Sequence, residues 1–182
     1  MAEVKKVSTP MSEEAAGGLR AGDEVLLSGE VFTARDMAHK HLCELIEKGE
    51  SLPIELAGAV IYFVGPTPAR AGAVIGSAGP TTSSRMDGFS PLLLSRGLKG
   101  MIGKGHRGAE VVAALKENGA VHFAATGGAG ALLSKHIVSC EVVAYDDLGT
   151  EAIRRLVVDD FPVIVAYDSV GGCVYDNIGE VR

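Results

Sequence analysis

Two cationic side chains lie in glycine-rich segments, where they can meet a small anion. Arg85 follows a run of hydroxyl side chains in segment 79–87, and Lys104 lies in segment 103–108. Each segment follows a predicted strand and precedes a predicted helix, as does a third glycine-rich segment, 126–130. In α/β proteins, ligands bind beyond the carboxyl ends of strands, where helix N-termini point free N–H groups at anions. Together the three segments predict a site for a small anionic ligand.

A third cation, Arg35, opens a predicted helix. Thr33 stands where it can cap that helix, and Asp36 then occupies the capping-box position. Because the N-terminal end of a helix carries partial positive charge, it disfavours an arginine. Carboxylate binding is one reason for Arg35 to be there, and an ordinary surface arginine is the alternative. His39 can orient Arg35, although a buried core histidine is the commoner interpretation.

The hydroxyl side chains of residues 81–84 exceed what capping one helix requires. A hydroxyl beside Arg85 and Lys104 can carry a proton if those charges lower its pKa. Spacing alone does not decide which hydroxyl does so.

Composition excludes several classes of protein. The chain has 182 residues, 47% of them hydrophobic, which is enough for one domain, residues 1–182, around a sizeable core. Its formal net charge of −6 argues against nucleic-acid and acidic-membrane partners. No apolar stretch reaches the ~18 residues of a transmembrane helix. Nucleotide binding is disfavoured, because no G-x-x-x-x-G-K-[ST] is present and residues 127–130 miss the G-x-G-x-x-G register.

The three cysteines, Cys43, Cys140 and Cys173, are too far apart to match a metal-ligand spacing. We therefore expect this chain to ligate no metal by itself. An odd, scattered set of cysteines, with no apolar signal segment at the start, predicts a reduced, cytoplasmic protein.

Strands and helices alternate along the predicted chain. Short apolar runs predict strands at 24–29, 59–64, 73–76, 98–102, 120–125, 138–145, 163–167 and 173–175, after an edge strand within 1–20. Apolar residues at three- and four-residue spacing predict helices at 34–48, from about 89, at 109–118 and shortly after 130. This alternation predicts an α/β layered domain with a largely parallel core sheet.

Four segments stand in the order seen in class I fumarases. They are T-A-R-D-M-A-H-K at 33–40, G-P-T-T-S-S-R-M-D at 79–87, G-K-G-H-R at 103–107 and G-G-A-G-A-L at 127–132. From about residue 7 onward, the chain resembles the beta subunit of a two-subunit class I (iron–sulfur) fumarate hydratase, or the C-terminal domain of the single-chain form. The beta subunit of L-tartrate dehydratase shares this framework. Ala34 and the Gly127-Gly128 pair favour fumarase, whereas His106 departs from the Asn often found there.

The resemblance implies a swivelling three-layer β/β/α domain and the reversible hydration of fumarate to L-malate. It implies a [4Fe-4S] cluster ligated by the alpha subunit and a shared active site at their interface. The chain alone, with a homodimer as its expected state, is then expected to be inactive. Carried over by motif, Arg35, Arg85 and Thr82 bind the dicarboxylate, Lys104 adds charge, and Thr81 is the proton carrier, slightly preferred to Thr82. A non-catalytic dicarboxylate-binding module is the remaining alternative.

Overall fold

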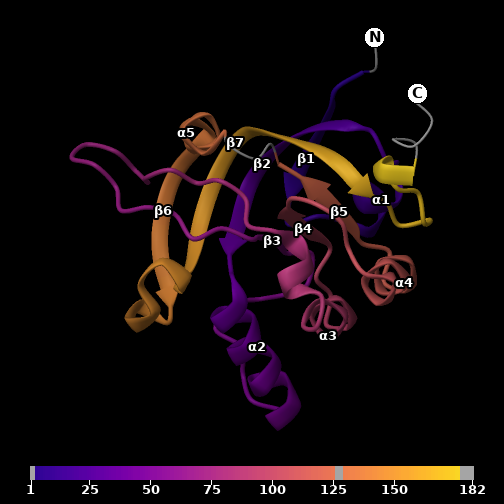
Figure 1. Cartoon of the computed structure of the whole chain (residues 1–182), viewed down its shortest axis with the longest axis horizontal. Coiled ribbons are helices and arrows are strands. Elements are labelled where there is room, and N and C mark those ends of the chain that lie inside the picture. Colours follow the sequence, from indigo (N-terminus) through magenta and orange to yellow (C-terminus); the bar gives the residue numbers. More distant parts are fainter. Residues whose placement is uncertain (1–2, 126–128, 177–182) are drawn as a thin grey trace.

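Seven strands and the helices around them make up the described part of the chain, residues 3–125 and 129–176 of a computed structural model (Figure 1). The strands are β1 (Lys5–Thr9), β2 (Glu24–Thr33), β3 (Val60–Tyr62), β4 (Gly100–Gly103), β5 (Val121–Ala124), β6 (Ile137–Ala144) and β7 (Ile153–Tyr167). The α-helices are α1 (Glu13–Gly17), α2 (Asp36–Lys48), α3 (Ser90–Ser95), α4 (Ala109–Glu117) and α5 (Gly130–Leu133). Shorter 3-10 helices are η1 (Ser83–Met86), η2 (Ser134–His136) and η3 (Asp146–Glu151).

Five of these strands close into a ring. The strands β2, β3, β4 and β5 run parallel as successive neighbours, and β7 runs antiparallel to both β5 and β2. Outside the ring, β1 pairs with β2 and β6 pairs with β7. The register of β7 on β2 shifts where Asp160 adopts a positive φ of 46°, a bend typical of a β-bulge. The predicted α/β class is confirmed. Strands β1 to β5 are parallel as predicted, but β6 and β7 pair antiparallel, so the sheet is mixed, and its closure is not predicted by the sequence.

Apolar side chains fill two cores, one inside the ring and one between the ring and the helices. Along β3, Val60 and Tyr62 belong to the inner core, whereas Ile61 and the following Phe63 belong to the outer one. Successive side chains of a strand point to opposite faces, which explains why the whole run 59–64 is apolar. Helices α2, α3 and α4 gather on one side of the ring and cover the outer core (Figure 1).

Three predicted strands differ from the structure. Residues 73–76 form no strand, because they belong to an excursion that leaves the sheet after β3 and crosses β6 and β7 in the view of Figure 1. Cys173 forms only an isolated bridge with Tyr167. The strand predicted at 163–167 begins ten residues earlier, at Ile153. The swivelling three-layer arrangement stays a prediction.

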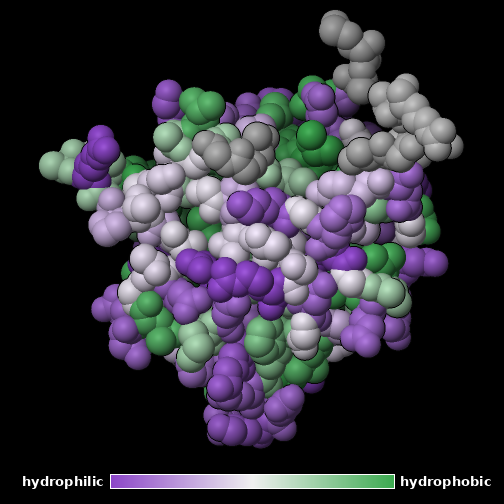
Figure 2. Space-filling view, in the orientation of Figure 1, coloured by the Kyte–Doolittle hydropathy of each residue, from purple (hydrophilic) through white to green (hydrophobic). Residues whose placement is uncertain are grey.

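The described surface is mixed in character. On the face drawn in Figure 2, hydrophilic side chains lie at the centre, at the lower tip and along both edges, and smaller hydrophobic groups lie among them. None of the described helices is long and apolar enough to cross a membrane.

Candidate functional site

The predicted site residues follow strands whose carboxyl ends lie side by side. Thr81 donates its backbone N–H to the carbonyl of Phe63, just after β3, at 2.7 Å. Ser83 donates its backbone N–H to the carbonyl of Lys104, just after β4, at 2.8 Å. Thr82 and Lys104 form a parallel bridge. These bonds bring Thr81, Thr82 and Lys104 together at one edge of the sheet.

Arg85 connects this edge to the start of α2. Its Nε and Nη2 donate hydrogen bonds to Oδ1 and Oδ2 of Asp36, at 3.1 and 2.8 Å. Two parallel bonds of this kind fix the plane of a guanidinium group. The side chain of Arg85 is still 49% exposed. Its remaining N–H groups are therefore accessible to a second carboxylate.

Arg35 precedes Asp36 and so belongs to the same edge. Its Nε is buried and has no hydrogen-bond partner among the described residues, and Oε1 of Glu151 lies 3.9 Å away. A Cβ at Gly65 would come within 2.5 Å of Nη1 of Arg35, so glycine leaves the room that this guanidinium occupies. Buried polar groups in proteins are normally hydrogen-bonded, so this Nε–H is an exception, and Glu151 is the carboxylate nearest to it.

His39 is the buried core histidine of the two alternatives, and its contact with Arg35 is to the backbone. It is buried beside Phe63 and Phe89, and its Nδ1–H donates to the carbonyl of Arg35 at 2.8 Å. Burial lowers the pKa of His39 to about 4, so the ring is neutral at pH 7. His39 is thus a core histidine that also holds the backbone of Arg35.

The predicted cap of α2 is wrong. Arg35 is the N-cap residue and makes no side-chain cap bond. Thr33 is the last residue of β2, and its hydroxyl is used across the sheet: it donates to the carbonyl of Ala152 at 3.3 Å and accepts the N–H of Arg154 at 3.0 Å. Asp36 pairs with Arg85 rather than closing a capping box.

The third glycine-rich segment is described only in part. Residues 126–128 lie outside the described residues. Gly130, at its end, accepts the backbone N–H of Ala78 at 3.2 Å, and its Cα lies close to Gly79. The described end of this segment therefore adjoins the start of segment 79–87.

A buried polar network that the sequence analysis does not single out lies beneath the two cation-bearing segments. Arg107, with a fully buried side chain, contacts Asp87, Ser90 and His122, and His122 contacts Ser83. The alternating pattern of the strand at 120–125 places His122 in the sheet. No spacing rule pairs it with an arginine fifteen residues earlier, because that contact exists only in the folded chain.

Metal binding by this chain has no support in the described ranges. Cys43 lies in α2, Cys140 in β6 and Cys173 after β7. Within residues 3–125 and 129–176, no three His, Cys, Asp or Glu side chains gather as metal ligands. An iron–sulfur cluster does not fit these cysteines.

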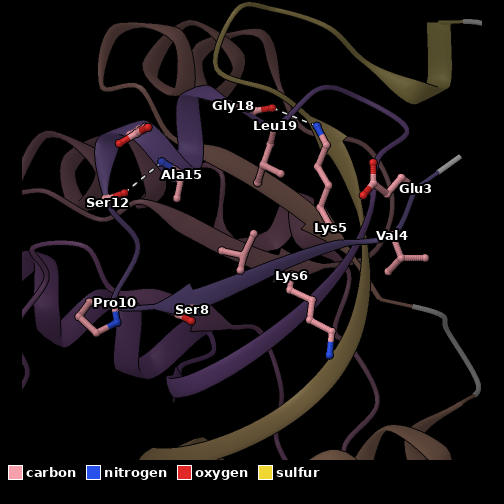
Figure 3. Close-up of a pocket in the computed structure, with 12 residues that line it drawn as sticks. Glu3, Val4, Lys5, Lys6, Ser8, Pro10, Ser12, Ala15, Gly18 and Leu19 are labelled. Carbon is pink, nitrogen blue, oxygen red and sulfur yellow. Dashed lines mark hydrogen bonds between the residues drawn. The ribbon is translucent and has the colours of Figure 1, made fainter.

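A groove of about 830 Å³ between β1 and α1 lies away from the predicted site (Figure 3). It is lined by residues from 3–19 and so contains none of the predicted site residues. Its Lys5 points toward the α1 turn, where Nζ donates to the carbonyl of Gly18 at 3.1 Å and pairs with Asp23 at 2.7 Å. The charge of Lys5 is therefore already balanced.

A family model described as "Fumarase C-terminus" matches residues 2–178. The chain belongs to the fumarase C-terminal family. It is 38% identical over 154 residues to "Fumarate hydratase class I, anaerobic" of Escherichia coli strain K12. These aligned residues cover 84% of this chain and 28% of that protein. It is 36% identical over 158 residues to "Fumarate hydratase 2" of Leishmania major, covering 86% of this chain and 28% of that protein.

A shorter relative matches over most of its own length. The "Putative L(+)-tartrate dehydratase subunit beta" of Methanocaldococcus jannaschii is 36% identical over 168 residues, which cover 89% of this chain and 86% of that protein. The resemblance drawn from the four segments is thus confirmed. This fumarase C-terminal chain spans between 28% and 34% of the fumarate hydratases that it matches, and 86% of the tartrate dehydratase subunit.

Proposed function

We propose that this chain is the beta subunit of a two-subunit class I fumarate hydratase, which hydrates fumarate reversibly to L-malate. The observation that carries the proposal is the gathering of Arg35, Arg85 and Lys104, with Thr81 and Thr82, at one edge of the sheet. Fumarate and malate are dianions, and guanidinium groups bind carboxylates in a fixed orientation. Membership in the fumarase C-terminal family supports the same activity.

The proposed mechanism assigns a role to each residue. Arg35 and Arg85 bind the substrate carboxylates, and Thr82 contributes a hydroxyl contact. Loss of the C3 proton of malate builds negative charge on the adjacent carboxylate, and Lys104 stabilises that charge. Such stabilisation reaches roughly 3–4 kcal/mol for one donor in a site that excludes water. Thr81, ionised to an alkoxide beside these cations, takes the C3 proton, and the C2 hydroxyl leaves as hydroxide to form the double bond of fumarate. A cluster on the alpha subunit would supply a Lewis acid for that hydroxide. In the hydration direction Thr81 returns the proton to C3 as hydroxide adds to C2.

The open geometry of the edge supports a partner chain. Thr82, Arg85 and Lys104 are exposed, so a dianion bound to this chain alone would stay hydrated. Since charge stabilisation is strongest where water is excluded, the proposal includes an alpha subunit that covers this edge. The [4Fe-4S] cluster would belong to that alpha subunit in a cytoplasmic hetero-oligomer. No step assigned to this chain runs through the cluster.

A second candidate is the beta subunit of an L-tartrate dehydratase. The match to a named tartrate dehydratase subunit over 86% of its length favours it. Tartrate is also a dicarboxylate, so the same three cations can bind it. The two candidates differ in the substrate that the assembled enzyme turns over.

Reconstitution tests the proposal. The chain is purified, assayed alone, and then mixed with a fumarase alpha subunit under anaerobic conditions, with fumarate and L-tartrate as separate substrates. We expect no turnover by the chain alone and fumarate hydration by the mixture. Faster turnover of tartrate would select the second candidate. Dicarboxylate binding without turnover of either substrate would identify a binding module and overturn the proposal.

A further inference from the structure

A buried ion pair lies beneath the two cation-bearing segments. Nε of Arg107 donates to Oδ1 of Asp87 at 2.7 Å, and Oδ2 of Asp87 accepts the backbone N–H of Gly108 at 2.7 Å. The side chain of Arg107 is 0% exposed, and its guanidinium carbon lies 5.3 Å from the centre of the Phe63 ring. Burial lowers the pKa of Arg107, and Asp87 opposes that shift. The pairing balances the charge of the buried Arg107, while the side chain of Asp87 stays 26% exposed.

The network continues from Arg107 to the hydroxyl-rich segment. Nη1 of Arg107 donates to Nδ1 of His122 at 3.1 Å, and Nε2 of His122 lies 3.1 Å from Oγ of Ser83. Burial, together with the charge of Arg107, lowers the pKa of His122 well below its usual value. The neutral ring therefore accepts at Nδ1 and donates its Nε2–H to Ser83. Nη2 of Arg107 also donates to Oγ of Ser90 at 2.6 Å.

These bonds connect segment 79–87 to segment 103–108 at two points. Ser83 and Asp87 enclose η1, which carries Arg85, while Arg107 follows Lys104 in the next segment. Gly103 leaves the space for this connection, because a Cβ there would collide with Oγ of Ser83. The Ser83 backbone N–H bond to the carbonyl of Lys104 then ties the two segments at the surface.

Stability alone is a weak reason for this arrangement. Replacing a buried ion pair by well-packed apolar side chains is often neutral or stabilising, because the charges lose their hydration when buried. A polar network, in contrast, selects one arrangement of the segments that carry it. Its members are all hydrogen-bonded, which makes it rigid.

We propose that Arg107, with Asp87, His122 and Ser83, is a positioning network that sets the placement of Lys104 relative to Thr81 and Arg85. This inference rests on the proposed function for its effect on turnover. None of the four residues needs to touch the substrate. They act through the hydroxyl and cationic side chains above them.

The test compares two serine substitutions in the full chain. Ser83→Ala removes the acceptor of His122, whereas the control Ser28→Ala removes a hydroxyl that accepts the N–H of Asp160 at 2.9 Å in the β2–β7 region. After reconstitution, we expect Ser83→Ala to lower kcat at least tenfold. Ser28→Ala should stay within about twofold of the wild type. Equal kcat values for the two variants, at equal Tm, would overturn the proposal.

Hydrogen exchange gives a readout that does not depend on activity. The backbone N–H groups of Thr81 and Ser83 tie their segment to β3 and β4. We expect His122→Asn to speed exchange at both amides at least tenfold, with exchange in α2 unchanged. Protection of both amides as in the wild type would contradict the network. If the wild-type assembly turns over neither dicarboxylate, the proposed function fails, and this measurement still decides the positioning role.

A conservative change separates position from charge. Arg107→Lys keeps a cation beside Asp87 but cannot reach His122 and Ser90 together, because an ammonium group lacks the planar fork. We expect a folded chain with kcat lowered at least fivefold and KM changed less than twofold. Wild-type kcat in Arg107→Lys would show that only the buried charge matters and would overturn the proposal.

Discussion

At the scale of single residues, Arg85 provides the sharpest test of carboxylate binding. In the proposed site, Arg85→Ala removes the charge-assisted hydrogen bonds between this guanidinium and a substrate carboxylate. Each such bond is worth roughly 1.5–3 kcal/mol. We expect KM for the dicarboxylate to rise at least about tenfold in the reconstituted enzyme, since ~1.4 kcal/mol is tenfold. Arg85→Lys should restore only part of the lost substrate affinity, because Lys cannot pair with both oxygens of Asp36. Arg96→Ala, at the exposed end of α3, is the control. An unchanged KM in Arg85→Ala would remove this residue from the site.

The two neighbouring threonines are expected to separate in kinetics. Thr81→Ala should lower kcat about 10²- to 10⁴-fold with little change in KM, because a proton carrier acts in the transition state. Thr82→Ala should raise KM and lower kcat less than tenfold, because the proposed role of Thr82 is substrate contact and not proton transfer. Steady-state kinetics of both variants in the reconstituted enzyme measure this difference. Equal losses of kcat would leave Thr81 without a special role.

Residue types and strand ends are enough to predict much of this site. Lys104 and Thr81 each follow a strand of a parallel sheet, and parallel strands bring their carboxyl ends to one edge. The partner of Arg85 is not predictable in the same way. Asp36 looks like a helix cap in sequence, and only the folded chain shows that its carboxylate faces Arg85 across the edge. Long-range hydrogen bonds depend on packing, and the sequence pattern carries little information about packing.

At the scale of elements, one buried carboxylate ties the end of β7 to the start of β2. Oδ2 of Asp168 accepts the backbone N–H of Ala21 at 3.0 Å, and Oδ1 accepts those of Val170 and Gly172 at 3.0 and 2.7 Å. Burial by itself raises the pKa of Asp168, but these hydrogen bonds outweigh it and the pKa is lowered. The ionised form therefore holds two loops that are distant in sequence.

Asp168→Asn tests this connection. We expect the free energy of unfolding at pH 7 to fall by roughly 1.5–3 kcal/mol, since charge-assisted bonds are lost. A lowered carboxyl pKa contributes stability above its unfolded value of about 3.9, and that stability disappears as pH falls through the folded pKa. In Asp168→Asn, the free energy of unfolding should no longer show this loss at low pH. Urea unfolding at several pH values measures it; equal stabilities at pH 7 would contradict the role of Asp168.

The elements themselves are predicted unevenly, for a physical reason. The helix predicted at 34–48 is found as α2, because its apolar spacing and the left-handed Gly49 at its end are local signals. Much of β7 is missed, because Asp159, Asp160 and Pro162 interrupt the apolar pattern. Asp159 and Asp160 belong to the bulge that bends β7. Ring closure depends on that bend and on pairing across more than 100 residues, and neither is a local property.

At the scale of the whole molecule, two buried histidines lie close to one core aromatic residue. The ring centres of His39 and His122 lie 5.2 and 6.1 Å from that of Phe63. Burial lowers the pKa of His39 to about 4 and that of His122 well below its usual value. Both rings are therefore neutral in the folded chain at pH 7. Protonating either ring is unfavourable, because the buried imidazolium would not be hydrated by water.

This arrangement predicts how stability depends on pH. Below the unfolded pKa of about 6.5, the unfolded chain binds a proton at position 39 and the folded chain does not, so the free energy of unfolding falls as pH falls. For His39 the loss is complete near pH 4. It amounts to roughly 3 kcal/mol at ~1.4 kcal/mol per pKa unit. Urea unfolding of wild type and His39→Asn between pH 7 and pH 4 measures it. We expect the slope of the free energy of unfolding against pH to fall by about one proton in His39→Asn. An unchanged slope would mean that His39 has the same pKa in the folded and the unfolded chain, which would contradict a buried, neutral ring.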